Sequence, residues 1–216
     1  KAGVPSLPFV QSSHEHTEMF LDTTFTTGAN AVALAPVDVP AYGFARNILL
    51  EVGISVAGAI GTGVIHEDYP WNLFTNIALL DVNGAPIFGP MDGYSAYVAN
   101  VVNANVGNPP KAAPGYSATY ASASFFLRIP LEIAHSTALG SIANQMSNAN
   151  YKLQLTVNSL AGLFSSVGTA TTNTFRLRAY LEAWSPPAAQ DMLGRPQTQA
   201  PPAMGTAQFW TAYTVP

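Results

Sequence analysis

Two short clusters of histidine and carboxylate side chains are where this sequence could do acid–base or metal chemistry. In His14-Glu15-His16, the imidazoles at i and i+2 would share one face of a strand, as two metal ligands can. In His66-Glu67-Asp68, three titratable residues follow one another directly. Consecutive loop residues point in different directions, however, and two imidazoles lack the further ligands of a metal site. We therefore predict no catalytic residues, no metal site and no cofactor, and interpret the clusters as a solvated arm and a solvated loop.

Other sequence patterns that carry chemistry are missing. The chain has no cysteine, which excludes a disulfide framework and zinc–thiolate sites. Gly61-Thr62-Gly63 lacks the continuation of a phosphate-binding loop, and no nucleophile-elbow sequence occurs. A cupin-like metal enzyme would need several histidines and a carboxylate converging inside a barrel. The four histidines all fall in predicted loops or arms: His14, His16, His66 and His135. We therefore expect a protein that is not an enzyme.

The composition describes a chain with few charges. Charged residues make up 9% of the chain and hydrophobic residues 48%, whereas about 25% charged residues is usual. Two interpretations remain open: a chain whose faces are covered by neighbouring subunits, or an extracellular or halotolerant β-protein with a surface of Thr, Ser and Asn. The net charge of −4 and the absence of Lys or Arg runs argue against direct nucleic-acid binding.

The length of 216 residues suits one large all-β domain or two small ones. No apolar run approaches the roughly 20 residues that span a bilayer. No signal peptide is visible, and the first residue is Lys1 rather than Met. We therefore expect the numbered chain to begin after a missing or processed N-terminus.

Alternation of apolar and polar residues predicts that most of the chain forms β-strands. The clearest signal is 124–133, followed by 152–157 with the same period of two. In the first of these, the residues predicted to face the core are Phe125, Leu127, Ile129, Leu131 and Ile133. The longest strand is predicted at Phe44–Ala57, and further strands at 18–27, 31–34, 74–81, 86–88 and 175–184. Around eight strands separated by long loops favour an all-β, antiparallel jelly-roll sandwich over a meander.

One or two short helices are expected in the connections. Asp92 is a suitable N-cap for a helix over 93–103, in which Tyr94, Tyr97 or Val98, and Val101 recur at helical spacing. We interpret this stripe as packing against the outside of a sheet. A single helical turn is predicted to begin at Ser136 or Thr137 and to run through Ala143.

The distribution of proline predicts three parts. Residues 1–17 form an extended N-terminal arm, 18–184 the jelly-roll domain, and 185–216 a Pro-rich linker or docking arm. The last part contains three aromatic residues that are too apolar for an idle linker and should dock on another surface. The candidate interface residues are Tyr69, Trp71, Trp184, Phe209, Trp210 and Tyr213. An alternative function is a carbohydrate-binding jelly-roll module, in which exposed Tyr69, Trp71, Tyr116 or Tyr120 would stack on sugar rings.

The order of these elements resembles the N-terminal jelly roll of the double jelly-roll major capsid proteins of tectivirus-like, membrane-containing double-stranded DNA phages. Four stretches carry the resemblance, which covers roughly 18–190. They are the strand at 44–57, the strand, turn and helix over 77–100, the strand 125–133 with its small helix and 152–157, and the strand 175–184 with its Pro-containing connection.

This resemblance implies a structural protein of the virion. Such subunits form trimers with a pseudo-hexagonal outline, which tile an icosahedral shell around an internal membrane. The chain departs from the family in two ways: it is too short for two jelly rolls, and it lacks the N-terminal amphipathic helix that lies against the membrane. It is therefore expected to be a fragment or half of a double jelly roll, or a capsid protein whose second jelly roll is a separate polypeptide.

Overall fold

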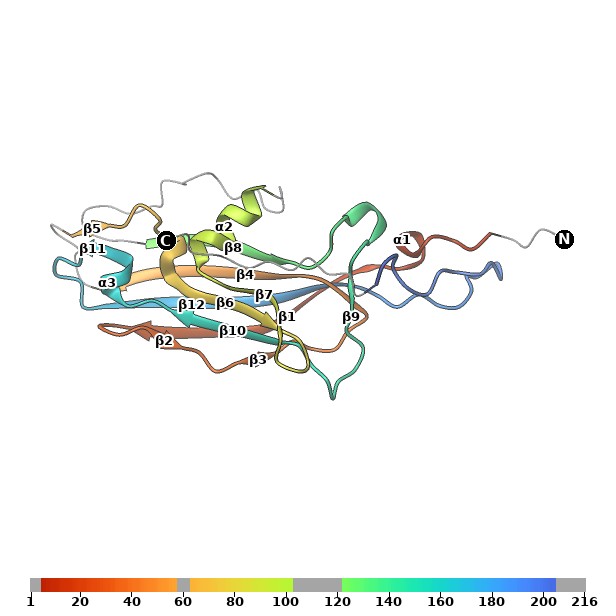
Figure 1. Cartoon of the computed structure of the whole chain (residues 1–216), viewed down its shortest axis with the longest axis horizontal. Helices are drawn as coiled ribbons and strands as arrows, with labels where there is room; N and C mark the ends of the chain where they lie inside the picture. Colours follow the sequence, from red (N-terminus) through yellow and green to blue (C-terminus); the bar gives the residue numbers. More distant parts are fainter. Residues whose placement is uncertain (1–4, 58–62, 103–121, 205–216) are drawn as a thin grey trace.

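Two antiparallel β-sheets form the body of the protein (Figure 1). The computed structural model describes residues 5–57, 63–102 and 122–204. The first sheet contains, in spatial order, β1 (Glu15–Thr27), β12 (Thr172–Trp184), β4 (Phe44–Ala57) and β8 (Ser122–Pro130), with β9 (Ile142–Ala143) also paired to β4. The second contains β2 (Val32–Ala33), β10 (Lys152–Val157), β6 (Phe74–Leu80) and β7 (Pro86–Met91), with β3 (Val37–Asp38) also paired to β10. A small separate sheet joins β5 (Val64–Ile65) to β11 (Phe164–Ser166).

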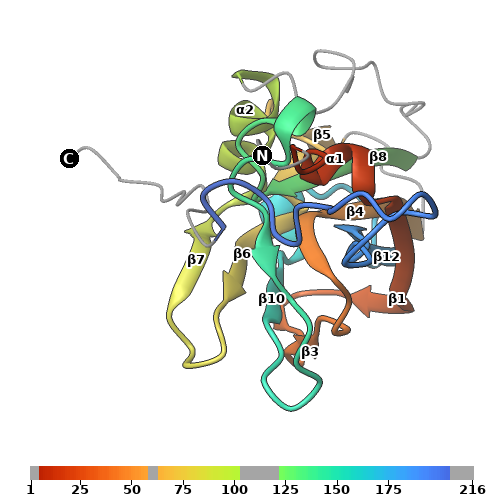
Figure 2. The same cartoon turned by 90° about the vertical axis from the view of Figure 1, so that its right-hand side faces the viewer.

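The strand order is that of a jelly roll. From β1 the chain crosses to β2 and β3, returns to β4, crosses to β6 and β7, returns to β8, crosses to β10 and returns to β12. The first and last long strands, β1 and β12, therefore lie side by side over nearly their whole length. Figure 2 shows the two sheets facing each other, with α2 above them. The predicted all-β, eight-stranded jelly roll is confirmed when β2 and β3 are counted as one interrupted strand and the two-residue β9 and the separate β5–β11 sheet are left out of the count.

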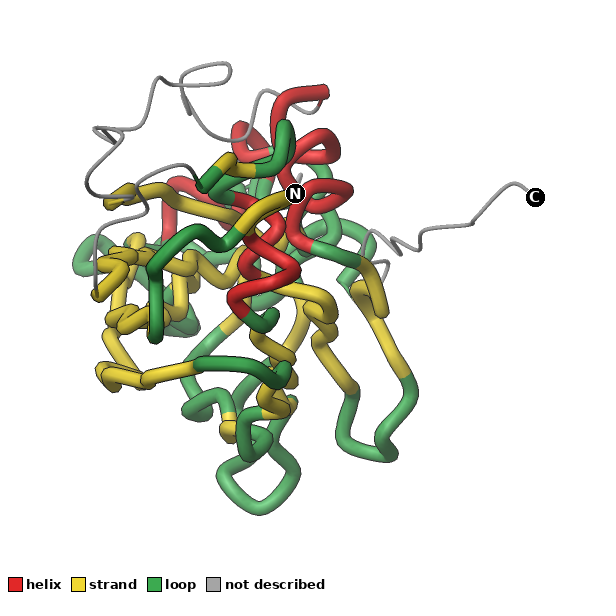
Figure 3. The backbone as a smooth tube through the Cα atoms, turned by 90° about the vertical axis from the view of Figure 1, so that its left-hand side faces the viewer, coloured by secondary structure: helices red, strands yellow, loops and turns green. Residues whose placement is uncertain are grey.

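Short helical segments occupy the connections between strands. Figure 3 shows that strands make up far more of the described backbone than helices do. The helical segments are α1 (Phe9–Ser12), η1 (Trp71–Leu73), α2 (Gly93–Val102), η2 (His135–Thr137) and α3 (Leu160–Leu163). Within the described ranges, none of them has the length and apolar character needed to cross a bilayer.

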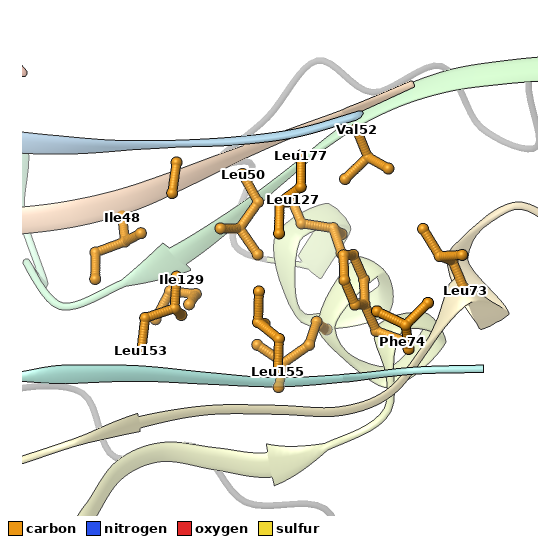
Figure 4. Close-up of a cluster of buried hydrophobic side chains, with 14 of the residues drawn as sticks. Ile48, Leu50, Val52, Leu73, Phe74, Leu127, Ile129, Leu153, Leu155 and Leu177 are labelled. Carbon is orange, nitrogen blue, oxygen red and sulfur yellow. The ribbon is translucent and has the colours of Figure 1, made fainter. Parts of the chain in front are cut away.

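The core lies between the two sheets and follows the predicted alternation. Strand β4 occupies the predicted residues, and its inward side chains Ile48, Leu50 and Val52 are buried. They face Leu153 and Leu155 of β10 across the sandwich (Figure 4). Each fully buried side chain of this kind contributes roughly 1.5–3 kcal/mol of transfer free energy.

The alternation predicted for 124–133 ends earlier than expected. Strand β8 stops at Pro130, and the amides of Leu131 and Glu132 both donate to the carbonyl of Arg46, at 3.0 and 2.8 Å. Two consecutive amides that share one acceptor interrupt the pleat, as in a β-bulge. As a result Glu132 is buried and Ile133 exposed, the reverse of the prediction. The helical turn predicted up to Ala143 is also shorter, because Ile142 and Ala143 pair with β4 as β9.

Helix α2 begins where predicted but buries a different face. Asp92 caps it, since its Oδ1 accepts from the amide of Ser95 at 2.8 Å. The buried residues are Gly93, Ala96, Tyr97, Ala99 and Asn100. The remaining members of the predicted apolar stripe, Tyr94, Val98 and Val101, are exposed together with Val102. Tyr97 stacks on Trp71 at 3.8 Å between ring centroids, which fixes the side of the helix that faces inward.

The described part of the N-terminal arm lies against the C-terminal segment. Strand β1 starts at Glu15, inside the predicted arm. Leu7 forms a parallel bridge with Gln197, and Phe9 is buried against Phe44 and Trp184. Both chain segments therefore pack at the same end of the sandwich (Figure 1). The division of the chain at residues 17 and 184 stays a prediction.

Candidate interaction surfaces

The two histidine clusters have separate, local partners. The His16 ring stacks on Tyr42 with centroids 4.0 Å apart, and its Nε2 lies 3.6 Å from a carboxylate oxygen of Glu18. The His14 amide donates to the hydroxyl of Ser185 at 2.8 Å. His66 is exposed in the turn before η1, where its carbonyl accepts from the Tyr69 amide. Over residues 5–57, 63–102 and 122–204, no three His, Asp or Glu side chains are placed to hold a metal ion.

Three of the six candidate interface aromatics are buried within the chain. Tyr69 and Trp71 are each 3% exposed, and Trp184 is 4% exposed. Trp71 packs on Tyr97 and Phe125, so a sugar ring cannot stack on it without unfolding this corner. The expectation that Tyr69 and Trp71 are exposed is therefore wrong.

The remaining aromatic candidates lie outside the described residues. They are Phe209, Trp210 and Tyr213 of the interface set, and Tyr116 and Tyr120 of the proposed sugar platform. An interface role for Phe209, Trp210 and Tyr213 stays a prediction.

A buried ion pair that the sequence analysis missed lies next to Trp184. Arg46 Nε donates to Glu132 Oε2 at 2.6 Å, and the Arg46 guanidinium lies over the Trp184 ring, 4.7 Å from its centroid. Trp184 Nε1 in turn donates to Glu132 Oε1 at 3.4 Å. Burying a charge is costly unless it is paired and hydrogen-bonded, and here both ions are. The available signal was Arg46 itself, a charge beside the apolar run of a core strand.

His135 and Glu15 extend this ion pair to the surface. Arg46 Nη1 lies 3.0 Å from Glu15 Oε2, and Arg46 Nη2 donates to His135 Nδ1 at 2.6 Å. The His135 ring is stacked on Trp184, and its Nε2 lies 3.3 Å from Glu15 Oε1. With Nδ1 accepting from an arginine, a neutral His135 ring carries its proton on Nε2, the ring nitrogen that lies near Glu15. The cluster ties the start of β1 to β4 and to η2.

The outer face of the first sheet carries a ladder of paired charges. Asp22 on β1 receives two hydrogen bonds from Arg176 on β12, at 2.8 and 2.6 Å. Glu51 on β4 accepts from Arg178 and from the Tyr180 hydroxyl at 2.9 Å. Arg128 on β8 donates to Glu182 at 3.0 Å. The cross-strand register places Asp22 and Glu51 opposite or diagonal to their arginine partners on the neighbouring strand, whereas Arg128 reaches Glu182 across the intervening strand β4.

These contacts shift the titration of the ladder residues. The Arg176 hydrogen bond, against an opposing desolvation effect, lowers the pKa of Asp22 below its usual value. The Tyr180 hydrogen bond, followed by those of Arg178, lowers the pKa of Glu51. The same hydrogen bond to Glu51 raises the pKa of Tyr180. For Asp22 and Glu51 the cause is hydrogen bonding to the charged carboxylate, whereas the bond that Tyr180 donates stabilises its neutral, protonated form.

The charges of the ladder cancel, so that this polar outer face of the first sheet has little net charge. Three arginines are paired with three carboxylates across the four strands, and apolar Met19 and Phe126 are exposed among them. Such a surface can lie against a neighbouring subunit without leaving an unpaired charge behind. It offers no cluster of one sign that would attract a phosphate backbone.

The comparisons with known proteins concern the fold. No protein-family model matches the chain, and no curated protein matches its sequence. The crystal structure of the STIV MCP aligns with a TM-score of 0.55 and 18% identity, over 83% of this chain and 51% of that chain. A chain from the atomic structure of Sulfolobus Turreted Icosahedral Virus aligns with a TM-score of 0.50 and 15% identity, over 78% of this chain and 45% of that one.

The present chain therefore spans about half the length of these solved structures. They are viral major capsid proteins, and what this chain shares with them is the jelly-roll fold.

Proposed function

We propose that this chain is a jelly roll of a viral major capsid protein and that its work is assembly into an icosahedral shell. The observation that carries the proposal is the jelly-roll strand order of the two sheets, together with the structural alignment of 83% of this chain on the STIV MCP. A jelly roll hosts many functions, so the proposal also needs support from the surfaces themselves.

Two surface properties support an assembly role. The outer face of the first sheet is polar but has its charges paired within the chain. Helix α2 has no charged residue and exposes Tyr94, Val98, Val101 and Val102 to solvent. Both surfaces could be covered by a neighbouring subunit without burying an unpaired charge.

The finer features of the proposal come from the family that the sequence resembles. They are a trimer with a pseudo-hexagonal outline, a second jelly roll in the same or another chain, and a shell around the internal membrane of a double-stranded DNA phage. The paired charges of the first sheet are in keeping with a protein that binds other subunits rather than nucleic acid. The proposed location is the virion.

The proposal is tested by imaging the intact gene product after expression and purification. Negative-stain electron microscopy should reveal compact particles with a three-fold, nearly hexagonal outline. Particles the size of a single chain at all concentrations would contradict the proposal. A glycan array run on the same sample should show no binding that depends on Tyr69 or Trp71, because both side chains are inaccessible.

A further inference from the structure

A cleft of about 550 Å³ lies at the end of the sandwich where β9 pairs with β4. Its volume falls within the roughly 300–1,000 Å³ of ordinary ligand pockets. Its walls mix apolar side chains with uncharged polar ones, and none of the described residues that line it is charged. The apolar side includes Phe44, Val82 and Met146, and the polar side Asn144, Gln145 and Gln199. An occupant of this cleft should therefore be uncharged, with an apolar body and a few polar groups.

Asn144 gives the cleft a buried hydrogen-bond acceptor in need of a donor. The residue lines the cleft and is 3% exposed. Its amide donates to the Gly43 carbonyl at 2.9 Å, and its Nδ2 donates to the Pro40 carbonyl at 2.7 Å, so the side chain is fixed. Its Oδ1 has no hydrogen-bond partner in the described part of the chain. Because a buried acceptor without a partner is costly, a group that enters the cleft should carry an N–H or O–H for this oxygen.

The C-terminal segment is held in place up to the same cleft. The Gly140 amide donates to the Pro202 carbonyl at 3.3 Å, which ties the segment to the loop after η2. Ala203 then adopts the left-handed conformation, with φ of 49°, which residues other than glycine keep only where the surrounding structure imposes it. The chain turns there, and the next residue, Met204, lines the cleft. The residues after Met204 therefore start beside the cleft, from a fixed point.

These residues have the composition that the cleft requires. The stretch 205–216 reads Gly-Thr-Ala-Gln-Phe-Trp-Thr-Ala-Tyr-Thr-Val-Pro and contains no charged side chain. Trp210 combines a large apolar body with a single donor, the indole N–H. The six residues from Met204 to Trp210 span at most about 20 Å when extended, which is enough to reach every wall of a cleft of this size.

We propose that the cleft is the docking site of the chain's own segment 205–216. In this arrangement the Trp210 ring lies against Phe44 and Met146, and its indole N–H donates to Asn144 Oδ1. Tethering at Met204 gives the segment an effective concentration in the millimolar range, which a separate molecule would rarely reach. Both surfaces are uncharged, so docking leaves no charge unpaired.

The docked segment closes this end of the sandwich and sets the direction in which the chain leaves the jelly roll. All parts of the contact belong to one copy of the chain. The inference therefore goes beyond the proposed assembly function and does not depend on it.

Quenching of tryptophan fluorescence by acrylamide tests the contact in the intact gene product. Trp71 and Trp184 are buried, so an accessible ring would be that of Trp210. With the ring docked, the quenching constant of the wild type should match that of Trp210→Phe at every protein concentration. Ala149→Phe fills the cleft and should raise the constant about threefold, because solvent then reaches a whole indole. Ala189→Phe, at an exposed position outside the cleft, is the matched control and should leave it unchanged.

Two further variants guard against an effect of misfolding. Gln145→Phe fills the cleft from an exposed position on another wall and should give the same rise. The double variant Ala149→Phe/Trp210→Phe should return to the low constant of Trp210→Phe. A chain unfolded by the larger side chain would instead expose Trp71 and Trp184 and stay strongly quenched, and the wild-type comparison and Gln145→Phe then decide.

The outcomes separate this inference from the proposed function. A wild-type constant well above that of Trp210→Phe would place the ring in solvent and overturn the docking. Protection that is lost on dilution would assign the cleft to another molecule, and protection that survives both cleft-filling variants would place Trp210 elsewhere; each result also overturns it. Assembled particles with an accessible Trp210 would leave the capsid proposal standing, whereas a monomer with a shielded Trp210 would leave only the docking.

Discussion

The side chain of Asn100 pairs with both backbone polar groups of Arg128. Its Nδ2 donates to the Arg128 carbonyl at 2.7 Å, and its Oδ1 accepts from the Arg128 amide at 2.7 Å. Asn100 is buried, and its Nδ2 also donates to the Ala96 carbonyl at 2.9 Å. One amide of α2 thus takes the place of a neighbouring strand on the free edge of β8. An edge strand covered in this way cannot pair with another chain at that point.

Replacing this side chain should destabilise the domain. Asn100→Ala removes the partners of two backbone groups under α2, and each buried unsatisfied group costs about 1–3 kcal/mol. We expect the free energy of unfolding to fall by about 2–4 kcal/mol in urea denaturation. Val98→Ala on the exposed face of the same helix is the matched control and should change it by less than about 0.5 kcal/mol. Equal effects of the two substitutions would show that the Asn100 hydrogen bonds do not contribute to the free energy of unfolding.

The Arg46–Glu132 pair predicts a non-additive mutant cycle. Arg46→Met leaves the buried Glu132 carboxylate without its strongest partner and should cost about 3–5 kcal/mol of unfolding free energy. The double variant Arg46→Met/Glu132→Leu removes both charges. It should be more stable than the single variant Arg46→Met by at least about 1 kcal/mol. The four proteins of the cycle are compared by denaturant titration. Additive losses would mean that the two residues act independently.

The charge ladder predicts how stability depends on pH. Because the pKa values of Asp22 and Glu51 are lowered in the folded chain, their contribution is complete above the ordinary values of 3.8 and 4.5. This contribution to stability is lost as the pH falls through the lowered pKa values that the two carboxyl groups have in the folded chain. Between about pH 5 and pH 2, the wild type should therefore lose stability more steeply than Asp22→Asn/Glu51→Gln. Thermal melts at several pH values measure this, and parallel curves would contradict it.

The two faces of β10 predict opposite results for substitutions at neighbouring positions. Leu155 is buried between the sheets, and Gln154 points to the outer face of the second sheet. Leu155→Asp should leave no folded protein, because a buried carboxylate has no partner there. Gln154→Asp should fold with near wild-type stability. Circular dichroism and the yield of soluble protein distinguish the two, and a folded Leu155→Asp variant would mean that the faces are reversed.

The sequence predicts strands best where the chain alternates without interruption. Strand β4 was predicted at its observed bounds, and the Asp92 cap of α2 was predicted, because both depend on local pattern alone. Glu132 was misplaced because its burial depends on Arg46, which lies 86 residues away in the sequence. No local pattern reports a partner at that distance.

The aromatic residues show the same limit. Tyr69 and Trp71 follow a polar cluster and were interpreted as packing or interface anchors, or as exposed residues of a sugar platform, and Trp71 is in fact enclosed by Tyr97 of α2 and Phe125 of β8. The exposed stripe of α2 was likewise assigned to packing, although the packed face is set by Tyr97 and Asn100. In both cases the deciding contact is between elements that the sequence does not place next to each other.

The central claim is that this chain is a subunit of an assembled shell. The most direct measurement is the mass of the intact gene product in solution at neutral pH, determined by native mass spectrometry over a range of concentrations. The claim predicts a dominant species of three copies, accompanied by larger closed assemblies. A single-chain mass at every concentration would contradict it.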